Sequence, residues 1–199
     1  MARRKAGMHR FLNAATFIGF VLFAENAYES ERTPRIAPLD QGPIPEVTEN
    51  MPQEVQEALL DSAAQALATA IRESRRQALD RGVDPIPPRI RAALEPYFGT
   101  QILDKARWTM AGGISLDGMM KHWFYLDGAV TVGEVIAFSD ATDAQEDVEL
   151  WAHELTHVNQ YEELGIEAFA SEYVRDFSNM ESQASRNASR IMASIGATK

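Results

Sequence analysis

The sequence predicts an α+β fold in which a small antiparallel sheet packs on one helix that carries a metal-binding motif. Apolar residues recur at helical spacing in 54–81, in 144–164 and again from 166 onward, which indicates a long early helix and further helices after it. Short stretches rich in aromatic and β-branched residues lie between them, within 106–138. The pattern His-Glu-x-x-His occupies 153–157, inside the second predicted helix.

The composition narrows the classes of protein to consider. The chain has 199 residues, 45% of them hydrophobic, which is enough for one main domain with one core. Its formal net charge of −10 argues against nucleic acid as a partner, because few cations are available to neutralise phosphates. The absence of cysteine excludes disulfides, a thiol nucleophile and thiolate zinc sites. A metal ion must therefore be bound by histidine and carboxylate side chains.

Residues 1–27 are predicted to form a signal peptide or an uncleaved signal-anchor. A basic stretch at 1–10 precedes an apolar run at 11–24, as in secretory signals. The run is short for a membrane span, which needs about 20 apolar residues. The positions after it form a poor cleavage site, so anchoring to the inner membrane through 11–24 and burial as a core helix stay open. We expect an exported protein, periplasmic or extracellular.

The next segments are expected to be a linker and two helices. Residues 28–53 hold five prolines without apolar periodicity, which is typical of an extended linker. The helix at 54–81 has one apolar stripe, and its arginines are expected to lie on a solvated face. A shorter helix is expected at 88–98, where Pro88 suits the first turn. Residues 54–199 then form the folded domain.

Three strands are expected at 106–110, 122–126 and 129–138. Asp127-Gly128 is typical of a hairpin turn between the last two. Gly133 lies inside the third strand, which indicates a bulge or the close approach of another backbone. We expect the strand near 132–138 either to align an extended substrate along its edge or only to pack.

The motif helix is expected to span 144–164. Asp143 with an acid three residues later is typical of an N-cap, and Gly165 is placed to end the helix in a left-handed conformation. His153 and His157 are four residues apart, so both rings lie on one face and can bind one ion.

Glu154 turns toward the same side, where its carboxylate can serve as general base for a metal-bound water. The alternative is that these histidines are ordinary surface or core groups.

A catalytic zinc ion needs a third protein ligand and leaves a fourth position for water. Position 163, where metzincins have a third histidine, is a glutamate, and no histidine follows His157. A downstream carboxylate is expected, with His122 as a further alternative. The carboxylates considered are Glu162 and Glu163 on the motif helix, Glu167 and Glu172 on the outer sides of the next helix, and Glu181 at the start of a third helical stretch.

Glu181 is the best placed of these carboxylates. The small Ala184 and Ala188 on its helix allow close approach to the motif helix. The same glutamate also completes a capping box with Ser178, in which it would only satisfy backbone N–H groups. The residues by themselves leave both roles open.

Motif residues also resemble a known family. They are Ala129-x-Thr131-x-Gly133-x-x-Ile136-x-Phe138, Ala152-His153-Glu154-Leu155-Thr156-His157-Val158-x-Gln160-Tyr161, Gly165, Phe169 and, upstream, Ile86-Pro87-Pro88-Arg89-Ile90-Arg91 with Phe98-Gly99. This set resembles a zincin-like domain of unknown function, often called the core domain associated with extracellular contractile injection systems. The resemblance implies a zincin-like metallopeptidase domain over 54–199.

A second resemblance concerns the third ligand. Glu181-Ser182-Gln183-Ala184 is similar to the E-x-x-A-D stretch of gluzincin peptidases, in which the first Glu binds zinc. It implies Zn²⁺ held by His153, His157 and Glu181. Ser185 replaces the Asp, so the usual orienting carboxylate is missing or comes from elsewhere.

These residues predict an exported zinc metalloendopeptidase that acts on a peptide or protein substrate. The ion would lower the pKa of its water toward about 7. Glu154 would accept the proton and pass it to the leaving amine. Tyr161, Tyr173 and His122 stay open as the group that stabilises the oxyanion. The alternative is a non-catalytic, metal-stabilised interaction domain of an envelope or secretion-associated assembly. The oligomeric state is not predicted.

Overall fold

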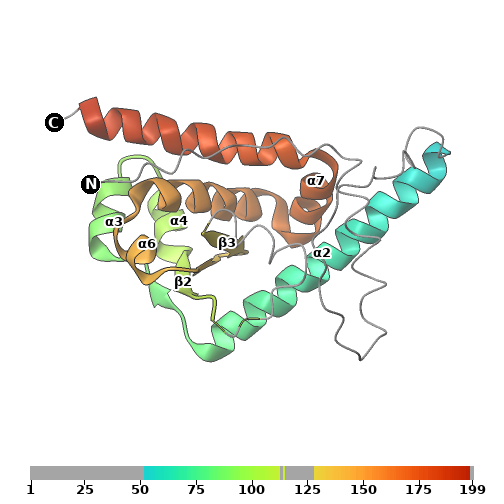
Figure 1. Cartoon of the computed structure of the whole chain (residues 1–199), viewed down its shortest axis with the longest axis horizontal. Helices are drawn as coiled ribbons and strands as arrows, with labels where there is room; N and C mark the ends of the chain where they lie inside the picture. The colour runs from blue at the N-terminus through green and yellow to red at the C-terminus, as the bar shows by residue number, and fades with distance from the viewer. Residues whose placement is uncertain (1–51, 113, 115–127, 198–199) are drawn as a thin grey trace, which may run out of the picture.

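The computed structural model describes residues 52–112, 114 and 128–197. The predicted signal segment, most of the linker, the predicted strand 122–126 and His122 lie outside the described residues. The described part is an α+β arrangement of a four-stranded sheet and helices (Figure 1). Among these residues, none of the helices combines the length and the apolar character that a membrane span requires.

The helices and strands follow one another along the chain with short connections. They are α2 (Gln53–Arg81), β1 (Asp84–Pro85), α3 (Pro88–Leu94), α4 (Thr100–Lys105), β2 (Arg107–Met110), β3 (Ala129–Val132), β4 (Val135–Phe138), α6 (Ala141–Glu146) and α7 (Val148–Ala197). Helix α7 is broken at Gly165 and Asp176, where the backbone is not helical, so it consists of three segments, 148–164, 166–175 and 177–197. The first and third segments lie side by side (Figure 1).

The sheet is mixed, and the expectation of an antiparallel sheet was wrong. Its strand order is β1-β2-β4-β3, with β2 and β4 parallel and the other pairs antiparallel. The predicted strand 129–138 is a hairpin that turns at Gly133 and Glu134. Gly133 has φ 71°, as the first central residue of a type II′ turn requires. Because the chain reverses there, β4 runs in the direction of β2.

The hairpin also changes which strand can align a substrate. Strand β4 has a neighbour on both sides, so residues 135–138 have no free edge. Strand β3 has one strand neighbour among the described residues. Gly133 forms a turn rather than a bulge, and the approach to it comes from the Arg75 side chain, whose Cδ would lie 3.0 Å from an added Cβ.

Several helix boundaries differ from the prediction. Helix α3 ends at Leu94, and α4 and the short β1 were not expected. The motif helix begins at Val148 rather than 144. The Asp140 carboxylate caps α6, and Asp147 Oδ1 accepts from the backbone N–H of Leu150 at 2.9 Å at the start of α7. Asp143 is therefore not the N-cap of the motif helix, because Asp140 and Asp147 accept the hydrogen bonds from the free N–H groups at the starts of α6 and α7.

The core lies on both faces of the sheet and positions the motif helix. Strand β4 is fully buried, with Val135 and Ala137 facing α2 and the later part of α7. Ile136 and Phe138 face α3, α4 and the first segment of α7. On that segment the predicted apolar stripe packs against the second face, through Trp151, Ala152, Leu155 and Val158. The opposite side of the segment is left for the motif side chains.

Candidate metal centre

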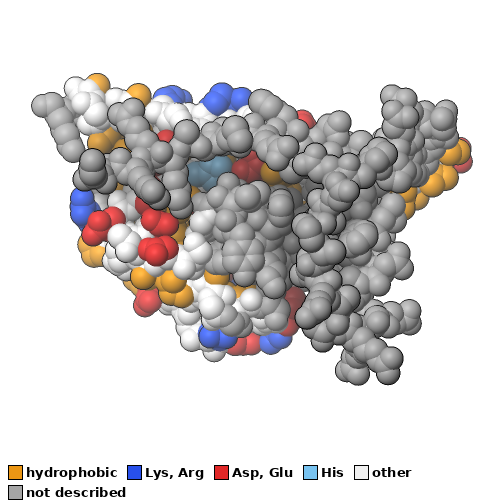
Figure 2. Space-filling view, in the orientation of Figure 1, with side chains coloured by type: hydrophobic (Ala, Val, Ile, Leu, Met, Phe, Trp, Pro, Cys, Tyr) orange, Lys and Arg blue, Asp and Glu red, His pale blue; other side chains and the backbone are white. Residues whose placement is uncertain are grey.

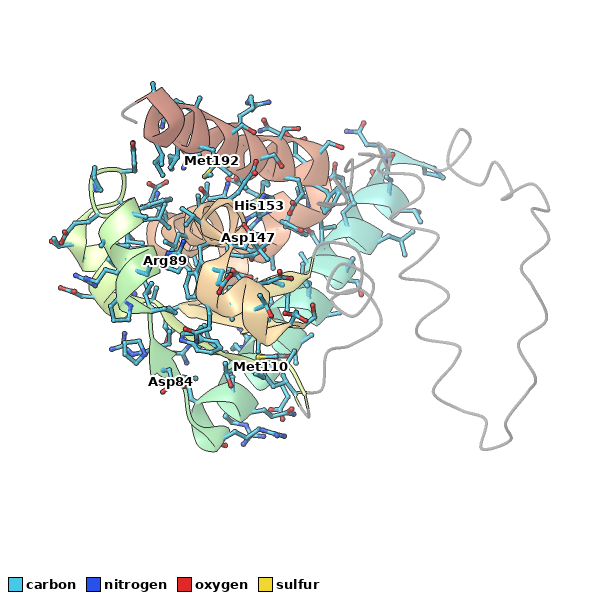
Figure 3. All side chains as sticks on the ribbon, turned by 60° about the vertical axis from the view of Figure 1, so that its left-hand side comes forward. Asp84, Arg89, Met110, Asp147, His153 and Met192 are labelled. Atoms are coloured by element: carbon cyan, nitrogen blue, oxygen red, sulfur yellow. The ribbon has the colours of Figure 1, made fainter. Side chains whose placement is uncertain are left out.

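The two motif histidines converge on one point. His153 and His157 lie on the first segment of α7, and their Nε2 atoms are 3.1 Å apart. In Figure 3, His153 lies between the first and third segments of α7. Figure 2 shows histidine and acidic side chains next to each other on one face of the molecule. The spacing of four residues therefore places both rings at one site, as the sequence predicted.

Glu181 reaches the same point from the third segment of α7. Its Oε2 atom lies 3.2 Å from His153 Nε2, and its Oε1 atom lies 3.3 Å from His157 Nε2. The breaks at Gly165 and Asp176 turn the chain back so that the third segment passes the motif. Both carboxylate oxygens face the rings, so Glu181 can act as a third ligand beside the two histidines.

The two histidine nitrogens and the two oxygens of Glu181, one facing each ring, are spaced much as the ligands of a small tetrahedral ion are. Zinc–ligand bonds of about 2.0–2.1 Å at tetrahedral angles place neighbouring ligand atoms about 3.3 Å apart. The nitrogen–nitrogen and nitrogen–oxygen distances here are 3.1, 3.2 and 3.3 Å. One ligand atom from each residue lies within 4.8 Å of the others. His153, His157 and Glu181 can therefore hold a metal ion.

Neighbouring groups orient two of these side chains. The Nδ1–H of His157 donates to Gln160 Oε1 at 2.8 Å, which leaves the lone pair of Nε2 directed at the site. The Tyr173 hydroxyl donates to Glu181 Oε1 at 2.6 Å. Gln160 thus orients the ring of His157.

The electrostatics of the site favour a cation between the three groups. Burial by itself would lower the pKa of His157, but the negative charge of Glu181 and its hydrogen bond raise that pKa to about 9. Burial would raise the pKa of Glu181, but the charge on His157 and hydrogen bonds from both rings lower it. A proton on His157 and a bound metal ion therefore compete for the same place.

Glu154 lies beside the centre with its carboxylate held in place. Only 3% of the residue is exposed, and its Oε2 accepts a hydrogen bond from Thr131 Oγ1 at 2.7 Å. Thr131 belongs to β3, so the edge of the sheet contacts the motif helix directly. The position three residues before His157 turns Glu154 toward the site, as expected.

All four motif and ligand side chains line one pocket. It holds about 480 Å³ of space, part of it open to solvent, where one water molecule takes roughly 30 Å³. None of the described residues that line it is a lysine or an arginine. The lining consists of Leu67, Ile71, Ala129, Val130, Thr131, His153, Glu154, His157, Tyr161, Phe169, Tyr173 and Glu181.

The other predicted candidates lie elsewhere or act differently. Glu162 pairs with Lys105, Glu163 accepts from Asn159, and Glu167 pairs with Arg72, while Glu172 is exposed. Tyr161 and Tyr173 both line the pocket, and burial raises the pKa of each hydroxyl.

Two contributions to the site were not predicted from the sequence. One is Gln160, which the spacing of three residues on one helix face could have paired with His157. The other is the wall formed by Leu67 and Ile71, which no local pattern indicates.

A family model described as the eCIS core domain matches residues 85–165. The match confirms, for this segment, the family that the motif residues resemble. It covers the sheet and the first segment of α7, with His153, Glu154 and His157, and it leaves out α2 and Glu181. Comparison with curated proteins and with solved structures found no match.

Proposed function

We propose that this chain is a zinc metallopeptidase of the gluzincin type, in which His153, His157 and Glu181 hold the ion. The observation that carries the proposal is the convergence of two imidazole nitrogens and one distant carboxylate at spacings of 3.1–3.3 Å. Two histidines and one glutamate are a ligand set that hydrolytic zinc sites use. The match of 85–165 to the eCIS core domain supports a domain built around this motif.

The chain's own residues supply the acid–base chemistry. A bound zinc ion lowers the pKa of water at its open position and polarises the substrate carbonyl. The Glu154 carboxylate accepts the proton and returns it to the leaving amine. The Thr131 hydroxyl restricts one oxygen of Glu154, so the other is free for proton transfer. Strand β3 is the place where the backbone of a peptide substrate can lie.

Export is part of the proposal. The basic and apolar segments at 1–24 are typical of a secretory signal, and the absence of cysteine agrees with any compartment. We propose that the protein is periplasmic or extracellular, either cleaved after the signal or anchored by it. Sequencing the N-terminus of the protein recovered from each cell fraction distinguishes these two forms.

Glu154→Gln tests the catalytic proposal. The variant keeps the shape of the side chain and cannot accept the proton, so it should bind zinc as the wild type does and lose at least about 10²-fold in peptide cleavage. Glu163→Gln, an exposed change on the same helix, is the matched control. Cleavage at the wild-type rate by Glu154→Gln would contradict the mechanism.

A second candidate function is a non-catalytic, metal-stabilised interaction domain of an envelope or secretion-associated assembly. The burial of Glu154 and its hydrogen bond to Thr131 favour it, because they give this residue a structural role. Both candidates predict bound zinc. A peptide-library assay separates them, since cleavage that a chelator abolishes and zinc restores supports only the enzyme.

A further inference from the structure

Helix α2 forms one wall of the candidate metal centre although it lies outside the matched family segment. Leu67 and Ile71, each 2% exposed, line the pocket together with the three ligand side chains. Helix α2 packs against α7 and also touches β3 and β4 (Figure 1). The family match begins at residue 85, four residues after α2 ends. This helix therefore lies over one side of the site.

The attachment of α2 depends on few large apolar side chains. Of its eight buried residues, five are alanine or serine, and only Leu60, Leu67 and Ile71 are large. Since hydrophobic stabilisation scales with the apolar area buried, the small residues on this face contribute less than large ones would, although all of its buried apolar residues belong to one core cluster.

Ion pairs supply a second attachment between α2 and the rest of the molecule. Arg175 pairs with both Glu57 and Asp61 at 2.7 and 2.6 Å. Arg72 pairs with Glu167, and Arg75 pairs with Glu134 of the β3–β4 turn. Except for Glu134, the partners are well exposed, so these pairs are individually weak and sensitive to salt.

The connection after α2 has the character of a hinge. Helix α2 ends at Gly82, which has φ 103° and no atom within 4 Å of an added Cβ. A glycine in open surroundings at the end of an element is a position where backbone angles can change at low cost. A rotation there would swing α2 away from the pocket and from β3.

We propose that α2 is a displaceable cover of the metal centre, which forms one wall of the partly open pocket in the described form and must move aside to admit an extended polypeptide. The inference rests on the proposed function for the nature of the substrate. In this proposal, the surface ion pairs that hold α2 in place control the access of a substrate to Glu154 and β3. Conditions that weaken those pairs should open the site without unfolding the sheet and the motif helix.

Two designs in the full-length chain test the proposal. The loosened variant, Arg72→Ser with Arg175→Ser, removes three of the pairs. Its control, Arg76→Ser with Arg91→Ser, removes the same charge, but Arg76 pairs only within α2 and Arg91 pairs with Asp104. The locked variant carries Asp61→Cys and Arg175→Cys, joined by a reducible bismaleimide, and the natural chain has no cysteine to interfere.

The first readout is the rate at which a chelator removes zinc, which does not depend on cleavage. We expect release to become roughly three- to tenfold faster in the loosened variant and to stay at the wild-type rate in the control. Cross-linking the locked variant should slow release, and reducing the linker should restore it. In the wild type, added salt should speed release.

Hydrogen exchange and cleavage complete the test. In the loosened variant, the backbone amides of α2 should exchange faster than those of 148–164. The rate of cleavage of a long peptide should change across the variants in the same direction as the rate of zinc release. Equal release from locked and unlocked protein, or exchange of α2 in step with 148–164, would overturn the proposal. If no variant cleaves any peptide, the proposed enzyme fails, while zinc release still decides whether α2 is a cover.

Discussion

Tyr173 restrains the carboxylate that completes the metal centre. Its hydroxyl donates to Glu181 Oε1, and the group is buried and held neutral by a raised pKa. Removing the hydroxyl in Tyr173→Phe leaves the ring and frees Glu181 to rotate. Loss of such an orienting partner typically costs 10- to 100-fold in metal affinity, so we expect a fall of about this size. Competition with a zinc-binding dye measures it.

Tyr97→Phe, at an exposed tyrosine, is the control for this change. Equal zinc affinity in wild type and Tyr173→Phe would show that Glu181 needs no such restraint.

His157 makes the metal-free protein sensitive to pH. Its folded-state pKa of about 9 lies above its ordinary value of 6.5. A raised pKa adds to the free energy of unfolding, here by at most about 3 kcal/mol. This contribution is fully present below pH 6.5 and is lost as the pH rises through 9. The lowered pKa of Glu181 acts on the acidic side, where stability falls as this group becomes protonated. Urea unfolding in the presence of a chelator should show both trends.

Two controls isolate this effect. Glu181→Gln should flatten the decline between pH 6.5 and 9, because the charge that raises the pKa of His157 is gone. Saturating zinc should also flatten it, since the ion takes the place of the proton. A metal-free wild type whose stability does not change over this range would contradict the assignment.

At this scale, local spacing predicted the histidines and Glu154, because helical geometry fixes their positions relative to one another. It could not place Glu181, which is 24 residues beyond His157 and reaches the site only through two breaks in α7. The small residues on its helix made Glu181 the best placed carboxylate, and the resemblance to gluzincins favoured the ligand role over the capping role. Gln160 was identified only as part of the motif shared with the resembled family, and its contact with His157 was not predicted.

Gly165 gives α7 the bend that the site requires. Its φ of 76° and ψ of 168° lie in a region that only glycine occupies readily. An added Cβ meets nothing within 4 Å, so the cost of Gly165→Ala is backbone strain alone. We expect a loss of about 1–3 kcal/mol in the free energy of unfolding. Urea titration measures this, and an unchanged midpoint would contradict it.

Gly99→Ala is the matched control for that change. Gly99 has φ −58° and equally open surroundings, so alanine should cost little there.

Among the elements, those with long periodic patterns were predicted well. Helix α2, the first segment of α7 and the break at Gly165 follow from the apolar stripe and from glycine. The hairpin at Gly133 and the parallel pairing of β2 with β4 were not predicted, because Gly133 was interpreted as a bulge or a close approach within one strand and not as the start of a turn. Helix α4 is too short for periodicity to show.

In the whole molecule, the metal centre joins segments that are distant in sequence. Its candidate ligands connect the first segment of α7 to the third, Thr131 connects the motif to the sheet, and α2 forms one wall of the partly open pocket. The α+β class followed from the order of the patterns. The role of α2 could not be predicted from the sequence. Its apolar stripe indicates that one face of the helix is buried, but not which part of the molecule that face covers.

Zinc content of the purified protein, measured by elemental analysis beside Glu181→Ala, tests the central claim most directly. The account predicts about one zinc ion per wild-type chain, and a variant that stays folded and loses most of its zinc. Glu172→Ala, an exposed glutamate on the neighbouring segment, should keep the ion. A Glu181→Ala variant with the same zinc content as the wild type would contradict the account.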